Sequence, residues 1–548
     1  MNADFVHDAV SRFSDDPEDI GRFRKVVIGL AIAGKLAGEG QRRSPAEMLD
    51  QIESEKIRLL RDGEIPKPKR FPPVIDEQLP EGFADPAAFA PLGAVARIEK
   101  GLTGIQGAKS GSFPLVVTAA ERGSCDHFDF DGAATIVPLV SSTGHGNASI
   151  NRLHYQEGRF ALGTILAAIF PYAPDLISAR FIFEYLSTFK DELLVSRMTG
   201  TANVTLSIGR IADVPIPLIC PTVQRKADEL MALCDQLEAA RVSREAARDT
   251  FTFSTLAKLN APDPEAFGAD ARFALANLAP LTTRPDQIKQ LRQTILNLAV
   301  RGKLVEQDTT DEPAEGLVQR IQRPIQEIAQ SLRLKVPQLP SMSDDQAPFE
   351  LPVGWCWVRF PELGAFGRGR SKHRPRNDPA LYADGKYHMI QTGDVARSKG
   401  LIQTHTAKYN DVGLAQSRLW PNGTLCITIA ANIADSGILD FAACFPDSVV
   451  GFVPAPCFEN ARYFEYFMRT AKTDLLAFAP ATAQKNINLD ILMQVMIPLP
   501  PLAEQHRIVA RVDELMALCD QLEASLILGV QTRSDLLEAV LHNALEPA

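Results

Sequence analysis

The chain has 548 residues, of which 45% are hydrophobic and 23% are charged. Such a chain is too long for one hydrophobic core and suits several globular domains. Its formal net charge of −10 argues against a general polyanion binder, so any contact with nucleic acid must come from a local basic patch or a partner. No apolar run reaches the roughly 18–20 residues that cross a bilayer, and the N-terminus lacks the pattern of a signal peptide. We therefore expect a cytoplasmic protein that makes no membrane contact.

The eight cysteines are scattered along the chain, with no CxxC pair and no cysteine–histidine cluster at the usual spacing of metal ligands. Several lie in apolar surroundings, for example Cys426 in "TLCITIA". This pattern is typical of small core residues in a reducing compartment. We therefore expect no bound metal ion.

The first elements expected in chain order are helices. "FRKVVIGLAIAGKL" (23–36) has periodic apolar residues that end at a glycine, as helix C-termini commonly do. "SPAE" (44–47) combines an N-cap serine, a first-turn proline and a glutamate, which together form a capping box that opens a second helix. The proline-rich stretch 64–83 follows as a semi-rigid connector.

Four blocks recur in the same order in the two halves of the chain. As pairs they are 23–36 and 291–304, 79–83 and 351–355, 201–218 and 482–499, and 228–239 and 513–524. The last pair is the identical dodecamer "DELMALCDQLEA". Recurring blocks indicate an internal duplication, with units over about 5–260 and 273–548. Because the interiors 85–213 and 350–495 match only weakly, we predict one repeated scaffold that holds two modules of different specificity.

Each dodecamer lies in a long amphipathic stretch. Apolar residues in these stretches alternate at steps of four and three, which is the pattern of a coiled-coil seam. The predicted seam residues are Leu230, Cys234 and Leu237 in the first copy and Leu515, Cys519 and Leu522 in the second. We expect the two helices to pack as an antiparallel pair about a pseudo-twofold axis. The first, over 221–259, would be roughly 55–60 Å long.

Three stretches carry a resemblance to a known family. "IPLPPLAEQHRIVARVDELMALCDQLEASL" (497–526), "LRQTILNLAVRGKLV" (291–305) and the segment 367–395 resemble the conserved regions and a common recognition-domain opening of the specificity subunit of type I restriction–modification enzymes. The resemblance covers nearly the whole chain. One departure is that the first unit is four residues shorter before its dodecamer, so Glu504 has no clear match there. We expect the first long helix to begin later or to dock differently.

The resemblance implies a mixed α/β fold in which two globular target recognition domains are separated by two long antiparallel coiled-coil helices. Each domain would read one part of a split DNA sequence. The expected segments are a helical conserved segment (1–62), a linker (63–84), recognition domain 1 (85–218), a long helix (219–260), a second helical segment (270–335), a linker (336–349), recognition domain 2 (350–499) and a distal long helix (500–548).

The resemblance also implies a subunit without catalysis and without a cofactor of its own. Its expected partners are double-stranded DNA and two adenine methyltransferase subunits that use S-adenosylmethionine, with an ATP-dependent restriction subunit as a further partner. An alternative interpretation, which the acidic net charge favours slightly, is a coiled-coil adaptor that assembles proteins without reading DNA. A single-chain enzyme is disfavoured because the chain has no NPPY- or DPPY-type tetrapeptide, P-loop or nuclease-like acidic cluster.

The strongest candidates for DNA contact lie in "GRGRSKHRPR" (367–376), a cationic run within an acidic protein. Arginine can pair with guanine or anchor phosphate, and the interleaved glycines and prolines deny the run a helix face. The alternative is a solvated charge run. The candidates are Arg368, Arg370, Lys372, His373, Arg374 and Arg376.

Further candidates are amides, hydroxyls and cations in flanking loops. For those in the second module, a plain turn or a polar loop is an equally good interpretation. In the second module they are Gln391, Thr392, Gln484, Lys485 and Asn486. In the first module they are Lys100, Thr103 and Lys109 in a glycine-rich basic loop, and Arg197, Thr199, Thr201 and Asn203 in the counterpart of 478–486.

Overall fold

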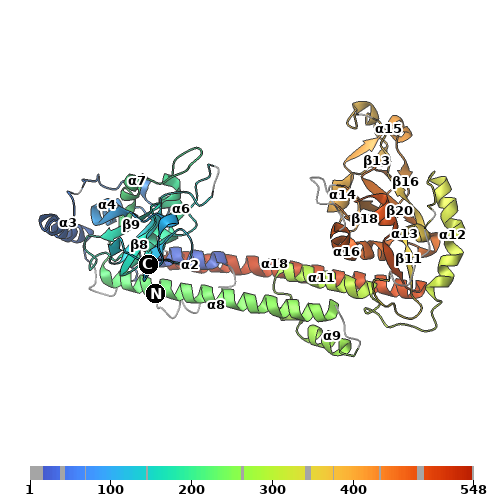
Figure 1. The fold of residues 1–548 in the computed structure, drawn as a ribbon, viewed down its shortest axis with the longest axis horizontal. Coiled ribbons are helices and arrows are strands. Elements are labelled where there is room, and N and C mark those ends of the chain that lie inside the picture. The colour runs from blue at the N-terminus through green and yellow to red at the C-terminus, as the bar shows by residue number, and fades with distance from the viewer. Residues whose placement is uncertain are drawn as a thin grey trace. The chain divides into compact units, whose positions relative to one another are not determined.

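The structure, a computed structural model, describes residues 17–36, 43–67, 69–143, 146–260, 265–337, 339, 347–373, 375–430, 433–477 and 487–545. The chain divides into two compact units, each described by itself. Unit 1 comprises Met1–Ala246 and Gly529–Ala548, and unit 2 comprises Ala247–Leu528. Helix α8 (Pro221–Asn260) begins in unit 1 and ends in unit 2, whereas α18 (Leu502–Leu545) begins in unit 2 and ends in unit 1 (Figure 1).

Unit 1 opens with two helices, α2 (Pro17–Ile32) and α3 (Pro45–Arg61). The predicted capping box is confirmed, since the Ser44 backbone N–H donates to the Glu47 carboxylate at 3.4 Å. The glycine after α2, Gly34, has a φ of +69°, which is the left-handed conformation expected at a helix C-terminus. Within the described ranges, no helix is both long and apolar enough to span a membrane.

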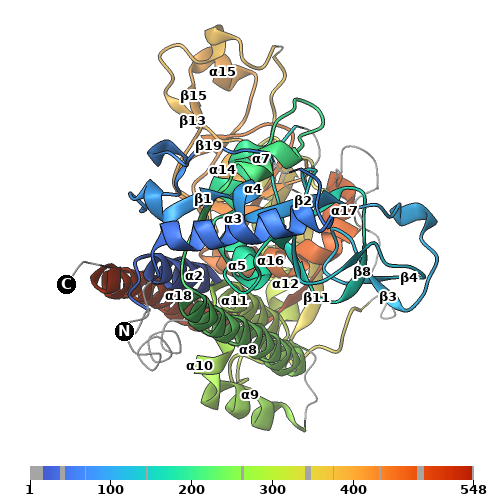
Figure 2. The ribbon, with the colours of Figure 1, turned by 90° about the vertical axis from the view of Figure 1, so that its left-hand side faces the viewer.

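Strands make up the middle of unit 1. A two-stranded ladder brings together the start and the end of this region, and two four-stranded sheets of order β2-β9-β6-β7 and β4-β3-β8-β5 lie between. Strands β1, β2, β3, β4 and β8 of this region are labelled in Figure 2. The strands are β1 (Phe89–Pro91), β2 (Ala96–Lys100), β3 (Phe113–Val116), β4 (Gly123–Cys125), β5 (Phe130–Asp131), β6 (Ala134–Pro138), β7 (His154–Gln156), β8 (Arg159–Leu162), β9 (Leu166–Pro171) and β10 (Pro215–Pro217). The α-helices are α4 (Leu92–Val95), α5 (Ala179–Thr188), α6 (Lys190–Leu193) and α7 (Ile208–Ala212), and the 3₁₀ helices are η1 (Asp76–Gln78), η2 (Pro86–Ala88), η3 (Ile105–Gly107) and η4 (Val195–Arg197).

Unit 2 repeats this order of elements. Its sheets have the orders β12-β20-β17-β18-β14 and β15-β13-β19-β16, and β11 pairs with β21. The strands are β11 (Cys356–Arg359), β12 (Gly364–Arg368), β13 (Tyr387–Met389), β14 (Leu401–Ile402), β15 (Ala407–Tyr409), β16 (Leu419–Trp420), β17 (Leu425–Thr428), β18 (Ser436–Leu439), β19 (Ala443–Cys444), β20 (Val449–Pro454) and β21 (Met496–Leu499). The helices are α9 (Phe267–Ala276), α10 (Leu278–Leu281), α11 (Pro285–Val300), α12 (Ala314–Ser331), α13 (Phe360–Leu363), α14 (Thr392–Arg397), α15 (Asp411–Ala415), α16 (Arg462–Ala477) and α17 (Leu489–Met493), with η6 (Pro379–Leu381) and η7 (Pro456–Phe458).

The strand topologies of the two units match strand for strand. Replacing β2, β9, β6 and β7 by β12, β20, β17 and β18 reproduces the first sheet, and replacing β4, β3, β8 and β5 by β15, β13, β19 and β16 reproduces the second. The one parallel pair in each second sheet also corresponds, β3 with β8 and β13 with β19. Unit 2 adds β14, α14 and α15 to this plan. The predicted mixed α/β fold is confirmed, and the weakly similar interiors share one topology.

In unit 1 the dodecamer packs against the short helix of its own unit. The Arg24 guanidinium on α2 contacts the carboxylates of Asp235 at 2.5 Å and Glu238 at 3.3 Å on α8. Leu230 and Cys234 of the dodecamer are buried in the same hydrophobic core as Phe23 of α2. The burial of these two predicted seam residues therefore arises within unit 1.

Unit 2 makes the corresponding contacts. The Arg292 guanidinium on α11 contacts Asp520 at 2.6 Å and Glu523 at 2.9 Å on α18, and Cys519 is buried in one core with Ile295 of α11. The dodecamer is thus docked in both units by an arginine of the short helix. The predicted pairing of the two dodecamer helices with one another stays a prediction.

The first residue of the dodecamer has different surroundings in its two copies. The Asp513 carboxylate accepts a hydrogen bond from the Tyr466 hydroxyl and lies 3.5 Å from Arg462. At the position of Tyr466, unit 1 has Glu184, which is buried on α5. Burial, reinforced by the charge of Glu184, raises the pKa of Asp228 to about 7, and burial also raises the pKa of Glu184. Unit 1 therefore holds two carboxyl groups where unit 2 holds a hydroxyl and a carboxylate.

The two long helices also begin differently. Helix α8 starts seven residues before Asp228 and α18 starts eleven residues before Asp513, so the first helix is about one turn shorter. The prediction that the first helix begins later is confirmed. The additional turn of α18 carries Glu504, whose buried carboxylate accepts a hydrogen bond of 3.0 Å from Trp355 Nε1. In unit 1 the equivalent of Trp355 is Phe83, which packs edge-on against other phenylalanine rings instead.

Candidate nucleic-acid interface

The predicted basic run begins in the last two residues of β12 and continues into the loop between β12 and β13 (369–386, the β12–β13 loop). Its backbone is held firmly at its start. The Gly369 N–H donates to the Val449 carbonyl at 2.8 Å, and a Cβ at Gly369 would lie 2.3 Å from a backbone oxygen. The side-chain oxygen of Gln416 accepts both the Lys372 and the His373 backbone N–H, at 2.6 and 3.0 Å. The loop therefore presents its side chains from a fixed backbone.

Acidic neighbours neutralise some of the predicted cations in this run. Arg376 contacts Asp447 at 2.6 Å, and the His373 ring nitrogen lies 2.7 Å from Asp378. The side chains of Arg368 and Lys372 are exposed. Arg374 lies outside the described residues.

Arg370 is half-buried and lies close to Arg418, which comes from the segment before β16. Arg418 was not among the candidates predicted from the sequence. Burial, with the neighbouring charge of Arg370, lowers the pKa of Arg418. Arg370 Nε is buried without a hydrogen-bond partner. The Arg418 guanidinium already donates to the backbone carbonyls of Arg368 at 3.0 Å and Arg333 at 3.3 Å. Arg370 is therefore the better candidate of the two for an anion such as phosphate. The signal in the sequence was weak, because Arg418 lies more than 40 residues from the basic run.

A cavity of about 340 Å³ lies beside the β12–β13 loop. Gln391 and Arg376, predicted from separate segments, both line it. The Gln391 backbone N–H donates to Asp394 at 2.8 Å at the start of α14, which fixes the position of this residue. Thr392 is half-buried as the first residue of α14. The other lining residues are Ser371, Asn377, Tyr382, Met389, Ala407, Tyr409 and Pro446. Gln484, Lys485 and Asn486 lie outside the part of the chain that the structure describes.

Unit 1 has its predicted basic loop at the corresponding place, between β2 and β3 (101–112, the β2–β3 loop). Lys100 and Lys109 are exposed there. Thr103 is only 5% exposed. Its hydroxyl lies between His127 Nε2 at 3.0 Å and Asp129 Oδ2 at 2.8 Å. The burial of this side chain argues against Thr103 as a DNA contact.

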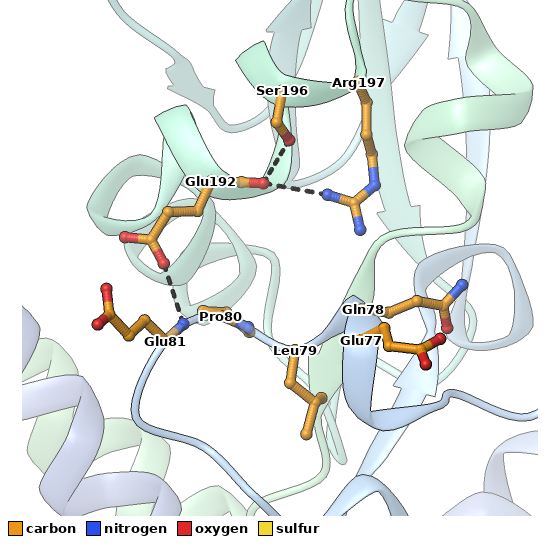
Figure 3. Close-up of a pocket in the computed structure, with 8 residues that line it drawn as sticks. All are labelled: Glu77, Gln78, Leu79, Pro80, Glu81, Glu192, Ser196 and Arg197. Carbon is orange, nitrogen blue, oxygen red and sulfur yellow. Dashed lines mark hydrogen bonds between the residues drawn. The ribbon is translucent and has the colours of Figure 1, made fainter.

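Arg197 also has a local structural role (Figure 3). Its guanidinium donates to the backbone carbonyls of Glu192 at 3.2 Å and Leu193 at 2.8 Å at the end of α6. The Glu192 carbonyl also accepts the Ser196 hydroxyl at 2.5 Å, and burial lowers the pKa of Arg197. It lines a cavity of about 520 Å³ together with Glu77 and Glu81. An acidic cavity disfavours a phosphate, so the structure argues against Arg197 as a DNA contact. The remaining candidates of this segment, Thr199, Thr201 and Asn203, are exposed.

Comparisons with known proteins identify relatives of the chain. Residues 352–531 match the family described as the type I restriction modification DNA specificity domain. The chain is 25% identical to the type I restriction enzyme EcoEI specificity subunit of Escherichia coli, with 96% of this chain and 94% of that protein covered. It is 23% identical to the EcoAI specificity subunit of the same organism, with the same coverage. Among solved structures, it is similar to the HsdS subunit from Thermoanaerobacter tengcongensis, at 17% identity and a TM-score of 0.40, covering 85% of this chain and 97% of that one.

Proposed function

Since this chain belongs to the family of type I restriction–modification specificity subunits, we propose that it is the subunit that selects the DNA sequence and performs no catalysis itself. Its two strand-rich modules, 85–218 and 350–499, each read one part of a bipartite DNA target. The subunit positions two adenine methyltransferase subunits, which bind S-adenosylmethionine, and it joins an ATP-dependent restriction subunit where one is present. The chain itself binds no cofactor that takes part in the methylation chemistry.

One observation carries this proposal. The two modules have the same strand topology, yet the equivalent loops differ in their side chains. The β12–β13 loop is flanked by Arg368 and presents Arg370 and Lys372, whereas the β2–β3 loop is flanked by Lys100 and presents Lys109. A repeated framework with different side chains at one position is suited to recognising two different base sequences.

The long helices supply the second part of the proposal. We propose that α8 and α18 pack as an antiparallel coiled coil about a pseudo-twofold axis and fix the distance between the two target sequences. Two observations support this. Helix α8 begins in unit 1 and ends in unit 2, whereas α18 begins in unit 2 and ends in unit 1. Equivalent arginines also dock both dodecamers. Because an arginine and a buried core hold each dodecamer, each helix would transmit its module's position rigidly.

Genome-wide mapping of methylated adenines tests the function. The chain is co-expressed with its methyltransferase partner in a host that lacks adenine methylation. We expect one bipartite motif with a constant spacer. Random methylation, or none with a methyltransferase that is active in another specificity complex, would contradict sequence reading by this chain.

A second experiment tests the β12–β13 loop. Arg370→Gln combined with Lys372→Gln should weaken duplex binding by the methyltransferase complex and reduce the slope of log affinity against log salt by about 0.9 for each lost phosphate contact. The matched control is Arg323→Gln on α12, whose side chain is 89% exposed in the same unit. Fluorescence anisotropy at several salt concentrations measures both quantities. Parental binding that does not depend on salt would favour the adaptor interpretation.

A further inference from the structure

Three different potential metal ligands follow one another where β4 ends. Cys125 Sγ lies 3.4 Å from His127 Nδ1 and 3.9 Å from Asp126 Oδ1, and the latter two atoms are 2.9 Å apart. Bond lengths typical of zinc place the donors of a tetrahedral site about 3.3–3.6 Å apart. The three donor atoms therefore need to move by only a few tenths of an ångström to surround one ion. Among the described residues, these three side chains are the group of histidine, cysteine and acidic residues whose donor atoms lie close enough together to share one metal ion.

The other ring nitrogen of His127, Nε2, is positioned by a chain of hydrogen bonds. Nε2 lies 3.0 Å from the Thr103 hydroxyl, which in turn donates to Asp129 Oδ2 at 2.8 Å. Asp129 Oδ2 also accepts the Leu162 backbone N–H at 2.8 Å, so the carboxylate is itself fixed. A hydroxyl that donates to a carboxylate accepts from Nε2–H, so Nδ1 is the nitrogen that would bind a metal once the proton that it shares with Asp126 is displaced. Metal-binding histidines are commonly oriented by such a chain of hydrogen bonds.

Burial leaves one side of the cluster open. Cys125 is fully buried, whereas the side chains of Asp126 and His127 are 47% and 52% exposed. An ion held by these three donors would thus have a thiolate on its inner side and a free coordination position toward solvent, which water can fill. A thiolate, an imidazole and a carboxylate suit zinc, whereas magnesium and calcium prefer oxygen ligands alone.

The cluster is attached to the β2–β3 loop. The Asp126 backbone N–H donates to the Lys109 carbonyl at 3.0 Å, and a Cβ at Gly111 would lie 2.4 Å from the Asp126 Cα. Thr103, which orients the histidine, belongs to the same loop. The position of the loop is therefore coupled to the geometry of the three donor side chains.

Unit 2 has no such donor set at the equivalent position. Cys125 on β4 pairs with Phe113 on β3, and Tyr409 on β15 pairs with Tyr387 on β13. Because β15 corresponds to β4 and β13 to β3, Tyr409 is the equivalent of Cys125. Asn410 follows it, and its side-chain oxygen accepts the Gly413 N–H at 3.0 Å as the N-cap of α15. The framework therefore does not require a metal ligand here, and the three donors distinguish the first module from the second.

We propose that Cys125, Asp126 and His127 bind one zinc ion that fastens the β2–β3 loop to the end of β4. Binding displaces the thiol proton of Cys125 and any proton shared between His127 Nδ1 and Asp126, and both are released to solvent. Water completes the coordination of the ion. The sequence alone predicted no metal site, because the two-residue step from Cys125 to His127 falls outside the usual zinc spacings. The zinc site is independent of whether the loop contacts DNA.

Metal analysis of the full-length chain tests the proposal. The chain is stripped with a chelator, dialysed against zinc and measured by mass spectrometry, and cobalt is then substituted to reveal a sulfur-to-metal charge-transfer band. We expect one zinc per chain and a thiolate band in the parent protein. The matched control Cys457→Ser, a half-buried cysteine in unit 2, should keep both. His127→Gln should weaken binding at least 100-fold.

Two further variants separate ligand loss from misfolding. Cys125→Ser should abolish the charge-transfer band, but Cys125 is fully buried, so this variant could also misfold. Loss of zinc binding by His127→Gln, at the exposed side of the cluster, is therefore the decisive result. Circular dichroism checks that each variant is folded. Thr103→Val should weaken zinc binding by about 10–100-fold, as expected for a partner that orients a ligand, while Thr103→Ser retains it. A parent chain without the thiolate band, or an unchanged zinc content in folded His127→Gln protein, would overturn the proposal.

Discussion

Asparagine at the first dodecamer position should have opposite effects on stability in its two copies. Asp228→Asn removes a carboxyl group whose pKa burial, reinforced by the charge of Glu184, raises to about 7 from 3.8. Asp513→Asn removes a carboxylate that accepts a hydrogen bond from Tyr466 and lies near Arg462. The two variants change the same residue of the same dodecamer, so each is the matched control for the other.

The size of the effect follows from the pKa. A rise of about three units corresponds to about 4 kcal/mol of unfavourable ionisation, and solvent screening at a partly exposed group reduces this to about 2 kcal/mol. Below about pH 4 the carboxyl group is protonated in both the folded and the unfolded state, so Asp228→Asn gains nothing there. Between about pH 4 and 7 the folded state binds the additional proton, so the parent loses stability as the pH rises. Asp228→Asn should therefore stabilise unit 1 by about 2 kcal/mol at pH 8, whereas Asp513→Asn should destabilise unit 2 by about 1 kcal/mol.

The assay has to distinguish the units, because their unfolding need not be one transition. All three tryptophans, Trp355, Trp357 and Trp420, lie in unit 2, so their fluorescence reports the effect of Asp513→Asn. Hydrogen exchange of α5 peptides, measured at pH 5 and pH 8, reports the effect of Asp228→Asn. Equal protection of parent and Asp228→Asn at pH 8 would refute the argument that the buried carboxyl pair destabilises unit 1.

Two other predictions concern how the helices dock. Arg24→Gln and Arg292→Gln should each lower the unfolding free energy of their own unit by about 1 kcal/mol, since each removes a partly exposed arginine that contacts two carboxylates. Urea unfolding measures this free energy, and an effect in only one unit would contradict equivalent docking. Trp355→Phe should cost about 1–3 kcal/mol, because it leaves the buried Glu504 carboxylate without its indole donor. Glu504→Gln in the same background should recover part of that loss, and no recovery would show that the lost packing of the indole dominates.

Local patterns in the sequence predicted the framework. The capping box at Ser44, the glycine after α2 and the missing turn before the first dodecamer depend on neighbouring residues or on helix periodicity, and the structure confirms them. Such features can be read without knowledge of tertiary contacts. Periodicity also identified the apolar side of the dodecamer.

Long-range contacts could not be predicted in this way. Arg24 and Asp235 are separated by 211 residues, so the ion pairs that dock the dodecamer leave no local pattern. The strands have between two and six residues, which is too short for a clear alternation of polar and apolar side chains. The shared topology of the two modules therefore became visible only in the structure. The burial of Thr103 could not be predicted for the same reason, because its partner Asp129 lies 26 residues further along the chain.

The two copies of the dodecamer also limit what identical sequence implies. Twelve identical residues form the same helix and bind equivalent arginines, because those contacts involve the repeated short helix. Asp228 and Asp513, by contrast, face a segment that is only similar, in which Glu184 replaces Tyr466. A hydroxyl donates a hydrogen bond to a carboxylate, whereas a second carboxylate repels it, so a single change across the contact reverses the sign of the interaction. The energetic role of a repeated residue is therefore set by its partner and has to be determined for each copy separately.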